Sequence, residues 1–234
     1  MDKLQKYKST DKMIDLIGDN YSLLQVMSRF GLSLGFGDKT VKEVCEMNNV
    51  DCQTFLVVVN FMAEGFSRMD VSADDISIPA LVDYLRQAHI YFLDYCLPDI
   101  RRKLIEAIDC SQDDVSFLIL KFFDGYMREV RKHMEYEEKT VFKYVDTLIH
   151  GNAPKNYQIS TFSKHHDQVG ERLTELKNII IKYCPAKANT NVLNAALFDI
   201  YACEEGLESH CKVEDYLFVP AILKLERRMR ENEK

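Results

Sequence analysis

The sequence predicts an all-α protein: an up-down-up-down four-helix bundle preceded by a small helical N-terminal domain. Prolines and glycines, which interrupt helices, number only 5 and 9 in 234 residues. Apolar residues recur at helical spacing, and the alternation of β-branched residues that is typical of strands is scarce. After residue 76, four long helical patterns follow one another with short connections, so neighbouring helices should run antiparallel.

The boundary between the two parts is expected in residues 70–79, a polar stretch that disfavours helix and separates two periodic regions. We therefore expect a small helical domain at residues 1–75 and the bundle at residues 76–234. In the small domain, Thr40 and Glu43 have the spacing of a capping box, so a short helix should begin there and end at Asn48. Asp51 can cap a second helix that runs through Phe61.

The bundle helices are expected at about residues 80–109, 113–150, 160–182 and 190–230. Asp113 is a good N-cap for the second helix. Gly151 and Pro185 follow the ends of the second and third helices, where such residues stop helices. Bends are expected near Pro98 and Pro220, because proline removes a backbone donor and clashes with the preceding turn.

Charge and hydropathy exclude several kinds of partner. The net charge is −7, whereas binding to nucleic acid or anionic membranes needs clustered Lys and Arg. No apolar run is long enough to span a bilayer, and the N-terminus lacks the apolar segment of a signal peptide. We expect a cytoplasmic protein that binds neither membranes nor nucleic acid; the sequence says nothing of its oligomeric state.

Histidines in a repeated pattern, one on each expected bundle helix, predict a metal site. In each half of the pattern the second histidine follows the first by 44 residues, and a glutamate follows that histidine by four. Positions i and i+4 lie on one face of a helix, so each His-x-x-x-Glu offers an imidazole and a carboxylate to the same point. Two such sets facing each other suit two metal ions. The candidate ligands are His89, His133, Glu137, His166, His210 and Glu214.

The ligand types narrow the choice of metal. Imidazole and carboxylate without thiolate suit Fe, Mn or Zn, and two carboxylates with imidazoles suit a pair of non-haem irons. Six protein ligands for two ions leave positions open to water or a small diatomic molecule. Acidic neighbours of the ligands, Glu138, Asp167 and Asp215, are either partners of the imidazole N–H groups or solvated surface charges.

Adjacent histidines, His165 and His166, compete for the place on the third helix. Val169, Leu173 and Ile180 recur at helical spacing from His166 and mark an inward face that contains it. We therefore choose His166, with His165 as the alternative.

With these motifs in view, the chain resembles the hemerythrin-like superfamily, whose HHE repeats are named for His, His and Glu. The matching stretches, within about residues 80–230, are His133-Met-Glu-Tyr-Glu137-Glu138, His166-Asp-Gln-Val-Gly170 and His210-Cys-Lys-Val-Glu214. More narrowly it resembles the bacterial repair-of-iron-centres proteins, di-iron proteins linked to restoring iron–sulfur clusters damaged by nitric oxide or oxidants. The resemblance implies two non-haem irons with the four histidines as terminal ligands and Glu137 and Glu214 as bridges.

The N-terminal segment departs from that narrower family in its cysteines. The family's small domain typically carries a Cys-Cys-Gly motif before a helix, whereas residues 31–37 here contain no cysteine. On spacing alone Cys45 and Cys52, seven apart across an expected turn, are poor substitutes. The number of cysteines is odd and no Cys-x-x-Cys occurs, so most are expected to be small buried hydrophobic residues. They are Cys45, Cys52, Cys96, Cys110, Cys184, Cys203 and Cys211.

Three functions follow as hypotheses. The first is a cytoplasmic non-haem di-iron protein of nitrosative or oxidative stress defence that acts on NO, O2 or peroxide, or supplies iron to iron–sulfur client proteins. The second is a reversible O2 or NO carrier or sensor with the N-terminal domain as its output module. The third is a regulator that binds DNA through residues 40–65, which the surplus of acidic residues in the N-terminal segment disfavours. The sequence leaves open whether the protein is an enzyme.

Overall fold

The computed structural model describes residues 6–64, 76–108, 114–152, 157–164, 169–185 and 188–232. These residues form helices joined by short loops and contain no strand; Lys12 and Thr40 make an isolated bridge. The expected all-α class is thus confirmed. No helix in the described part of the chain is long and apolar enough to cross a membrane.

Short helices make up the described N-terminal residues, and their caps agree with the sequence. The backbone N–H of Glu43 donates to the Thr40 hydroxyl over 3.3 Å, and the N–H of Thr40 donates to Glu43 Oε2 over 2.8 Å, which completes the capping box. Asp51 Oδ1 accepts the N–H of Thr54 over 2.7 Å. The elements are α1 (Met13–Asp19), α2 (Leu23–Arg29), α3 (Val41–Met47) and α4 (Cys52–Glu64).

Long helical stretches follow, and three of them contain a π-helical turn. The first consists of α5 (Ile78–Ile90), the π turn η2 (Tyr91–Cys96) and α6 (Leu97–Ala107). The second consists of α7 (Asp114–Tyr136), the π turn η3 (Glu137–Val141) and α8 (Phe142–Ile149). The fourth consists of α10 (Thr190–Val213), the π turn η5 (Glu214–Phe218) and α11 (Val219–Asn232).

The third stretch differs from the expected continuous helix over 160–182. It opens with a 3-10 helix, η4 (Ile159–Lys164), and the α-helix α9 covers Val169–Tyr183. The reason lies in the residues of η4, where Ile, Ser and Thr have low helix propensity and Ser and Thr compete for backbone hydrogen bonds. Two predicted features, the cap at Asp113 and the choice between His165 and His166, lie outside the described residues.

Contacts divide the chain into two compact units whose limits fall within continuous helices. The first unit comprises residues 1–88, 148–155 and 212–234, and the second comprises residues 89–147 and 156–211. The predicted domain boundary at residue 75 lies at the end of a segment, 65–75, outside the described residues, so the two-domain division stays a prediction.

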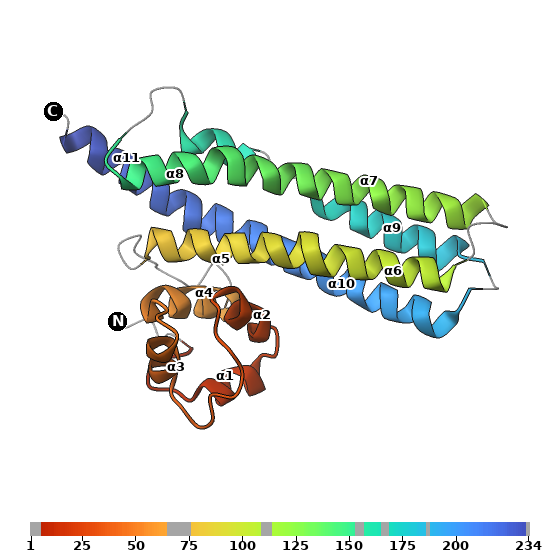
Figure 1. The fold of residues 1–234 in the computed structure, drawn as a ribbon, viewed down its shortest axis with the longest axis horizontal. Coiled ribbons are helices and arrows are strands. Elements are labelled where there is room, and N and C mark those ends of the chain that lie inside the picture. The colour runs from red at the N-terminus through yellow and green to blue at the C-terminus, as the bar shows by residue number, and fades with distance from the viewer. Residues whose placement is uncertain are drawn as a thin grey trace. The chain divides into compact units, whose positions relative to one another are not determined.

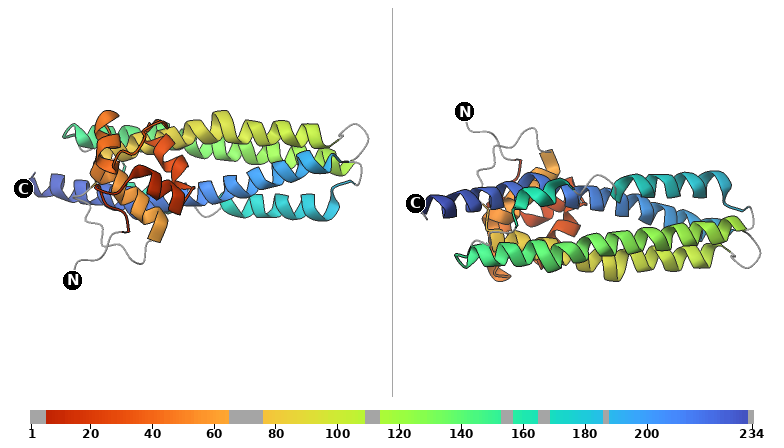
Figure 2. Two further views of the ribbon diagram at one scale, coloured as in Figure 1. Left: turned by 90° about the horizontal axis from the view of Figure 1, so that it is seen from below. Right: turned by 90° about the horizontal axis from the view of Figure 1, so that it is seen from above.

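In the second unit, α6, α7, α9 and α10 lie side by side as a four-helix bundle (Figures 1 and 2). The inward stripe of α7 repeats at helical spacing and holds Ile119, Phe123, Tyr126, Val130 and Met134. Polar contacts connect the four helices in a closed ring, from α6 to α7, α7 to α9, α9 to α10 and α10 back to α6. They are Arg101–Asp124, Arg172–Glu129, Lys177–Glu204 and Lys103–Asp199.

In the first unit, the N-terminal helices pack on residues from distant parts of the chain. The side chain of Asn60 exchanges hydrogen bonds with the backbone of Tyr7, over 2.8 and 3.0 Å. The guanidinium of Arg29, buried in α2, donates to the Tyr84 hydroxyl of α5 over 3.2 Å. The ring of Phe61 in α4 lies 6.2 Å from that of Tyr216 in η5, centroid to centroid.

Candidate metal centre

Glu137 is the centre of the candidate site, because each of its carboxylate oxygens lies against a different imidazole. His89 Nε2 is 2.8 Å from Glu137 Oε2, and His133 Nε2 is 2.7 Å from Glu137 Oε1. His89 stands at the end of α5, and His133 is one turn before Glu137 on α7. The i,i+4 pairing predicted from the sequence therefore exists, and the first helical stretch adds a second imidazole to the same carboxylate.

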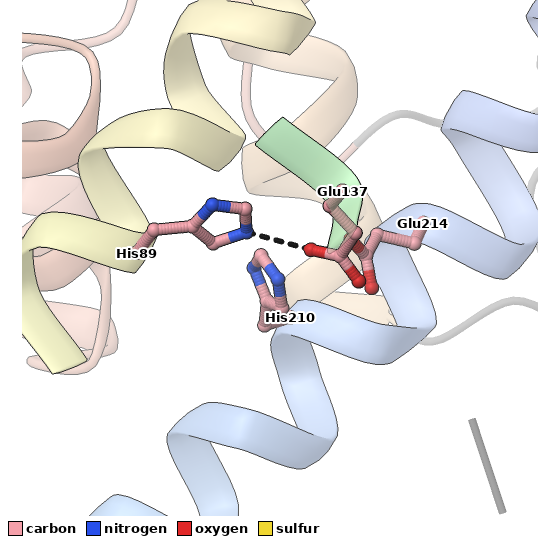
Figure 3. A group of neighbouring side chains, drawn as sticks. All are labelled: His89, Glu137, His210 and Glu214. Carbon is pink, nitrogen blue, oxygen red and sulfur yellow. Dashed lines mark ion pairs between the residues drawn. The ribbon is translucent and has the colours of Figure 1, made fainter. Parts of the chain in front are cut away.

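His210 and Glu214 complete the cluster from the fourth stretch. One ligand atom from each of His89, Glu137, His210 and Glu214 lies within 4.8 Å of the others. The rings of His89 and His210 are 5.2 Å apart in an edge-on arrangement. Figure 3 shows the carboxylates of Glu137 and Glu214 ending beside each other, with both imidazoles turned toward them.

The cluster is buried, and the burial of two carboxylates is the main indication that a cation binds there. Glu137 and Glu214 are both 0 % exposed, and His89 and His210 are 3 % and 1 % exposed. Two neighbouring carboxylates without solvent repel each other and lose hydration, which costs several kcal/mol unless a cation compensates. The donor set of imidazole nitrogen and carboxylate oxygen is one that Fe, Mn or Zn accepts.

Each of the two short contacts fits a pair of ligands that share an ion. Both imidazole nitrogens approach Glu137 closely, yet neither oxygen of Glu137 accepts a hydrogen bond of good geometry from a described residue. Ligand atoms about 2.1 Å from one ion and at right angles to each other lie about 3 Å apart. The observed separations of 2.8 and 2.7 Å are close to that value. The residues present therefore fit a metal.

Opposing effects act on the pKa of Glu137. Burial disfavours the carboxylate and would raise the pKa, but the neighbouring imidazoles, that of His133 first, outweigh burial and hold the pKa below its ordinary value. Glu137 is therefore the negatively charged form that a metal requires.

The carboxylate of Glu138, which is not one of the candidate ligands, orients His89. Glu138 Oε1 lies 2.9 Å from His89 Nδ1, and since a carboxylate only accepts, Nδ1 carries the proton. This tautomer leaves the Nε2 lone pair facing the cluster. Of the three acidic neighbours noted in the sequence, Glu138 makes this contact, and Asp167 lies outside the described residues.

Each π turn begins at or just after a residue of the cluster. The N–H of Phe142 donates to the carbonyl of Glu137, and the N–H of Val219 donates to the carbonyl of Glu214, both five residues back. η2 begins two residues after His89. Such turns are rare and occur frequently at functional sites.

Prolines explain two of the π turns. Pro98 and Pro220 each stand two residues after the end of a π turn, η2 and η5. A proline has no N–H for the carbonyl four residues back and its ring crowds that carbonyl, so a wider turn relieves the clash. The sequence predicted bends at these prolines, and the structure has π turns immediately before them. η3 has no such proline, and the sequence did not predict a bend or a π turn there.

Aromatic side chains pack around the cluster. The ring of Phe142 stacks on His89 with centroids 5.5 Å apart, and Phe92 meets His210 edge-on at 6.1 Å. The hydroxyls of Tyr136 and Tyr157 are 3.2 Å apart. Burial, followed by the hydrogen bond with Tyr136, raises the pKa of Tyr157. The rings of Phe142 and Phe92 cover the imidazoles, and the negative charge of Glu137 also contributes to the raised pKa of Tyr157.

Comparison with known families agrees with this geometry. Residues 80–222, more than half of the chain, match the family described as the hemerythrin HHE cation binding domain. The chain belongs to the hemerythrin HHE family. Compared with curated proteins, it has no significant match. This HHE protein therefore has the helical bundle and the buried His/Glu cluster of a non-haem metal protein, while the narrower resemblance to the repair proteins stays a prediction.

Proposed function

We propose that this HHE protein holds two non-haem irons in the bundle and uses them on O2, NO or peroxide in nitrosative or oxidative stress. The observation that carries the proposal is the pair of fully buried carboxylates, Glu137 and Glu214, next to each other and to imidazoles. When bound there, iron would supply a Lewis-acidic, redox-active centre for a small diatomic molecule or peroxide.

The assignment of two irons is supported by the two separate contacts of the Glu137 carboxylate. Its two oxygens face two different imidazoles, those of His89 and His133, as a carboxylate shared between two ions would. We assign the six predicted residues as ligands: His89, His133, His166 and His210 as terminal ligands, and Glu137 and Glu214 as bridges. His166 is included on the sequence pattern alone.

The protein's own residues have distinct tasks in this proposal. Glu138 keeps the proton of His89 on Nδ1, so that Nε2 can be a metal ligand. Phe92 and Phe142 pack on the imidazoles and exclude water from them. Glu137 and Glu214 supply negative charge that balances the metal. In the cell we place the protein in the cytoplasm, with damaged iron–sulfur proteins as one class of client.

Metal analysis of protein purified without oxygen tests the proposal. We expect about two irons per chain and an optical spectrum that changes on exposure to air and to NO. His133→Ala combined with Glu137→Gln should lose the metal, whereas Glu135→Gln, an exposed carboxylate on the same helix, should keep it. Retention of two irons by the double variant would refute the ligand assignment.

A sensor is the second candidate function, and one contact favours it. Tyr216 follows Glu214 by two residues in η5, and its ring packs against Phe61 of α4 in the N-terminal part. A change at Glu214 can thus reach the N-terminal helices through one aromatic pair. Stopped-flow mixing of the reduced protein with NO separates the functions: an enzyme gives product on repeated turnover, and a sensor gives one stable adduct per site.

A further inference from the structure

A chain of tyrosines begins beside the metal cluster and connects the second helical stretch to the third. The hydroxyl of Tyr136, the last residue of α7, lies 3.2 Å from the hydroxyl of Tyr157, which comes just before η4. The ring of Tyr157 in turn meets the ring of Tyr144 in α8, with centroids 4.8 Å apart. Tyr136 and Tyr157 are 21 positions apart in the sequence, so their hydroxyls meet only in the folded chain.

The hydroxyl pair is close to the metal cluster. Tyr136 immediately precedes Glu137 and follows His133 by three residues, so Tyr136 and His133 share a face of α7. Burial and then the hydrogen bond with Tyr136 raise the pKa of Tyr157, and the charge of Glu137 adds to this shift, so Tyr157 lies within the electrostatic range of the cluster. Glu137 is fully buried, whereas Tyr136 and Tyr157 are half-buried. The two phenols therefore connect the buried cluster to the partly exposed surface of the bundle.

The chemistry of the two phenols suits them to giving up electrons. The chain has 12 tyrosines and no tryptophan, so phenols are its most easily oxidised aromatic side chains. A phenol that loses an electron also releases its hydroxyl proton, and a neighbouring hydroxyl, which both donates and accepts, can take part in that transfer. The contact between the hydroxyls also holds the carbons next to the two C–OH groups near each other, and these are the carbons at which phenoxyl radicals couple.

We propose that Tyr136 and Tyr157 supply electrons to the metal centre when it reacts with peroxide, and that this reaction joins their rings as a dityrosine cross-link. Each phenol gives up one electron and its hydroxyl proton and becomes a neutral phenoxyl radical. The two radicals form one carbon–carbon bond next to the hydroxyl-bearing carbons, and the hydrogens lost from the bonded carbons restore the two hydroxyls. One hydrogen peroxide takes up the two electrons and two protons and leaves as two waters. This role rests on the proposed function, since a redox-active metal carries the electrons from the phenols to the peroxide.

A second pair of tyrosines separates this chemistry from simple nearness to a ligand. Tyr91 follows His89 by two residues, and its ring lies 5.9 Å from that of Tyr95, centroid to centroid. Tyr95 is 67 % exposed and is therefore more accessible than either half-buried member of the hydroxyl pair. If exposure and nearness to a ligand decided the reaction, Tyr95 would be oxidised first. If the contact between hydroxyls decides it, Tyr136 and Tyr157 react first.

The test is a peptide map of the iron-loaded protein after one equivalent of hydrogen peroxide, with dityrosine fluorescence as a second readout. We expect one cross-link within the chain, joining the tryptic peptides 133–139 and 156–164, which carry Tyr136 and Tyr157. Tyr157→Phe keeps the ring and should bind as much iron as the natural chain, but it should form no cross-link. Tyr95→Phe is the matched control and should be cross-linked as the natural chain is.

Three results overturn the proposal: oxidation of Tyr95 before the hydroxyl pair, oxidation of Cys211 next to His210 in place of the cross-link, or consumption of peroxide without dityrosine. A zinc-loaded sample should form no cross-link, because zinc has no redox chemistry. Equal cross-linking with zinc would refute the route through the metal centre. A chain that holds no iron refutes the proposed function together with this role, whereas a chain that holds iron and consumes peroxide without cross-linking refutes this role alone.

Discussion

Replacing Glu138 by glutamine should weaken metal binding without removing a ligand. The carboxylate holds His89 through a 2.9 Å contact to Nδ1, and His89 in turn faces Glu137 through Nε2. Glutamine keeps the size and an acceptor oxygen but loses the charge that makes the imidazole more basic and fixes its tautomer.

The expected loss of metal affinity depends on how exposed the side chain of Glu138 is. Loss of such an outer partner typically reduces metal affinity by about 10- to 100-fold. The side chain of Glu138 is 36 % exposed, so solvent screens part of its charge and the lower end applies. We expect about a tenfold higher Kd, or about 1.4 kcal/mol, for Glu138→Gln, and a larger loss for Glu138→Ala, which also removes the acceptor.

Competition with a chromogenic chelator under anaerobic conditions measures the Kd. Glu135→Gln is the matched control, since Glu135 is on the same helix, is 46 % exposed and contacts only Lys139 among the ion pairs described. It should leave the Kd within about twofold of the natural value, as for a surface charge. An unchanged Kd for Glu138→Gln, or equal losses for both variants, would refute the orienting role.

Further predictions concern the stability of the fold, measured by urea unfolding, and DNA binding. Phe142→Ala removes a fully buried ring from against His89 and should cost about 3–5 kcal/mol. Thr40→Ala removes the capping box of α3 at a cost of about 1 kcal/mol. Because the hydrogen bonds from Thr40 lower the pKa of Glu43, the stabilisation by the capping box is present near neutral pH and is lost as the pH falls through that lowered pKa. Gly151→Ala places a side chain at φ 82° and should cost about 1 kcal/mol, whereas Gly18→Ala, inside α1 with open space around it, should stabilise by up to about 1 kcal/mol. No salt-dependent DNA binding is expected from residues 40–65 in a fluorescence anisotropy titration, and a clear salt dependence would reopen that hypothesis.

Helix positions were predictable because their signals are local. The capping box at Thr40, the cap at Asp51 and the stop at Gly151 depend on residues within a turn of the helix end, and the structure has each of them. The third helical stretch was the exception. There the apolar spacing predicted an α-helix from residue 160, but low local propensity produces a 3-10 helix first.

The pairing of His133 with Glu137 was predictable for the same reason, since four residues of helix fix the relation between the two side chains. What the sequence could not indicate is which groups meet across helices. The contact of His89 with Glu137 joins residues 48 positions apart, and the contact of His89 with Glu138 depends on how the first and second helical stretches are rotated against each other.

The sequence by itself determined the all-α class, the long helical stretches and the His-x-x-x-Glu pairs, because helical periodicity and capping are encoded by neighbouring residues. Only the tertiary structure decided that two carboxylates lie buried beside each other and that Glu138 fixes the tautomer of His89. Such contacts depend on the register and rotation of packed helices, which the whole set of core side chains sets jointly.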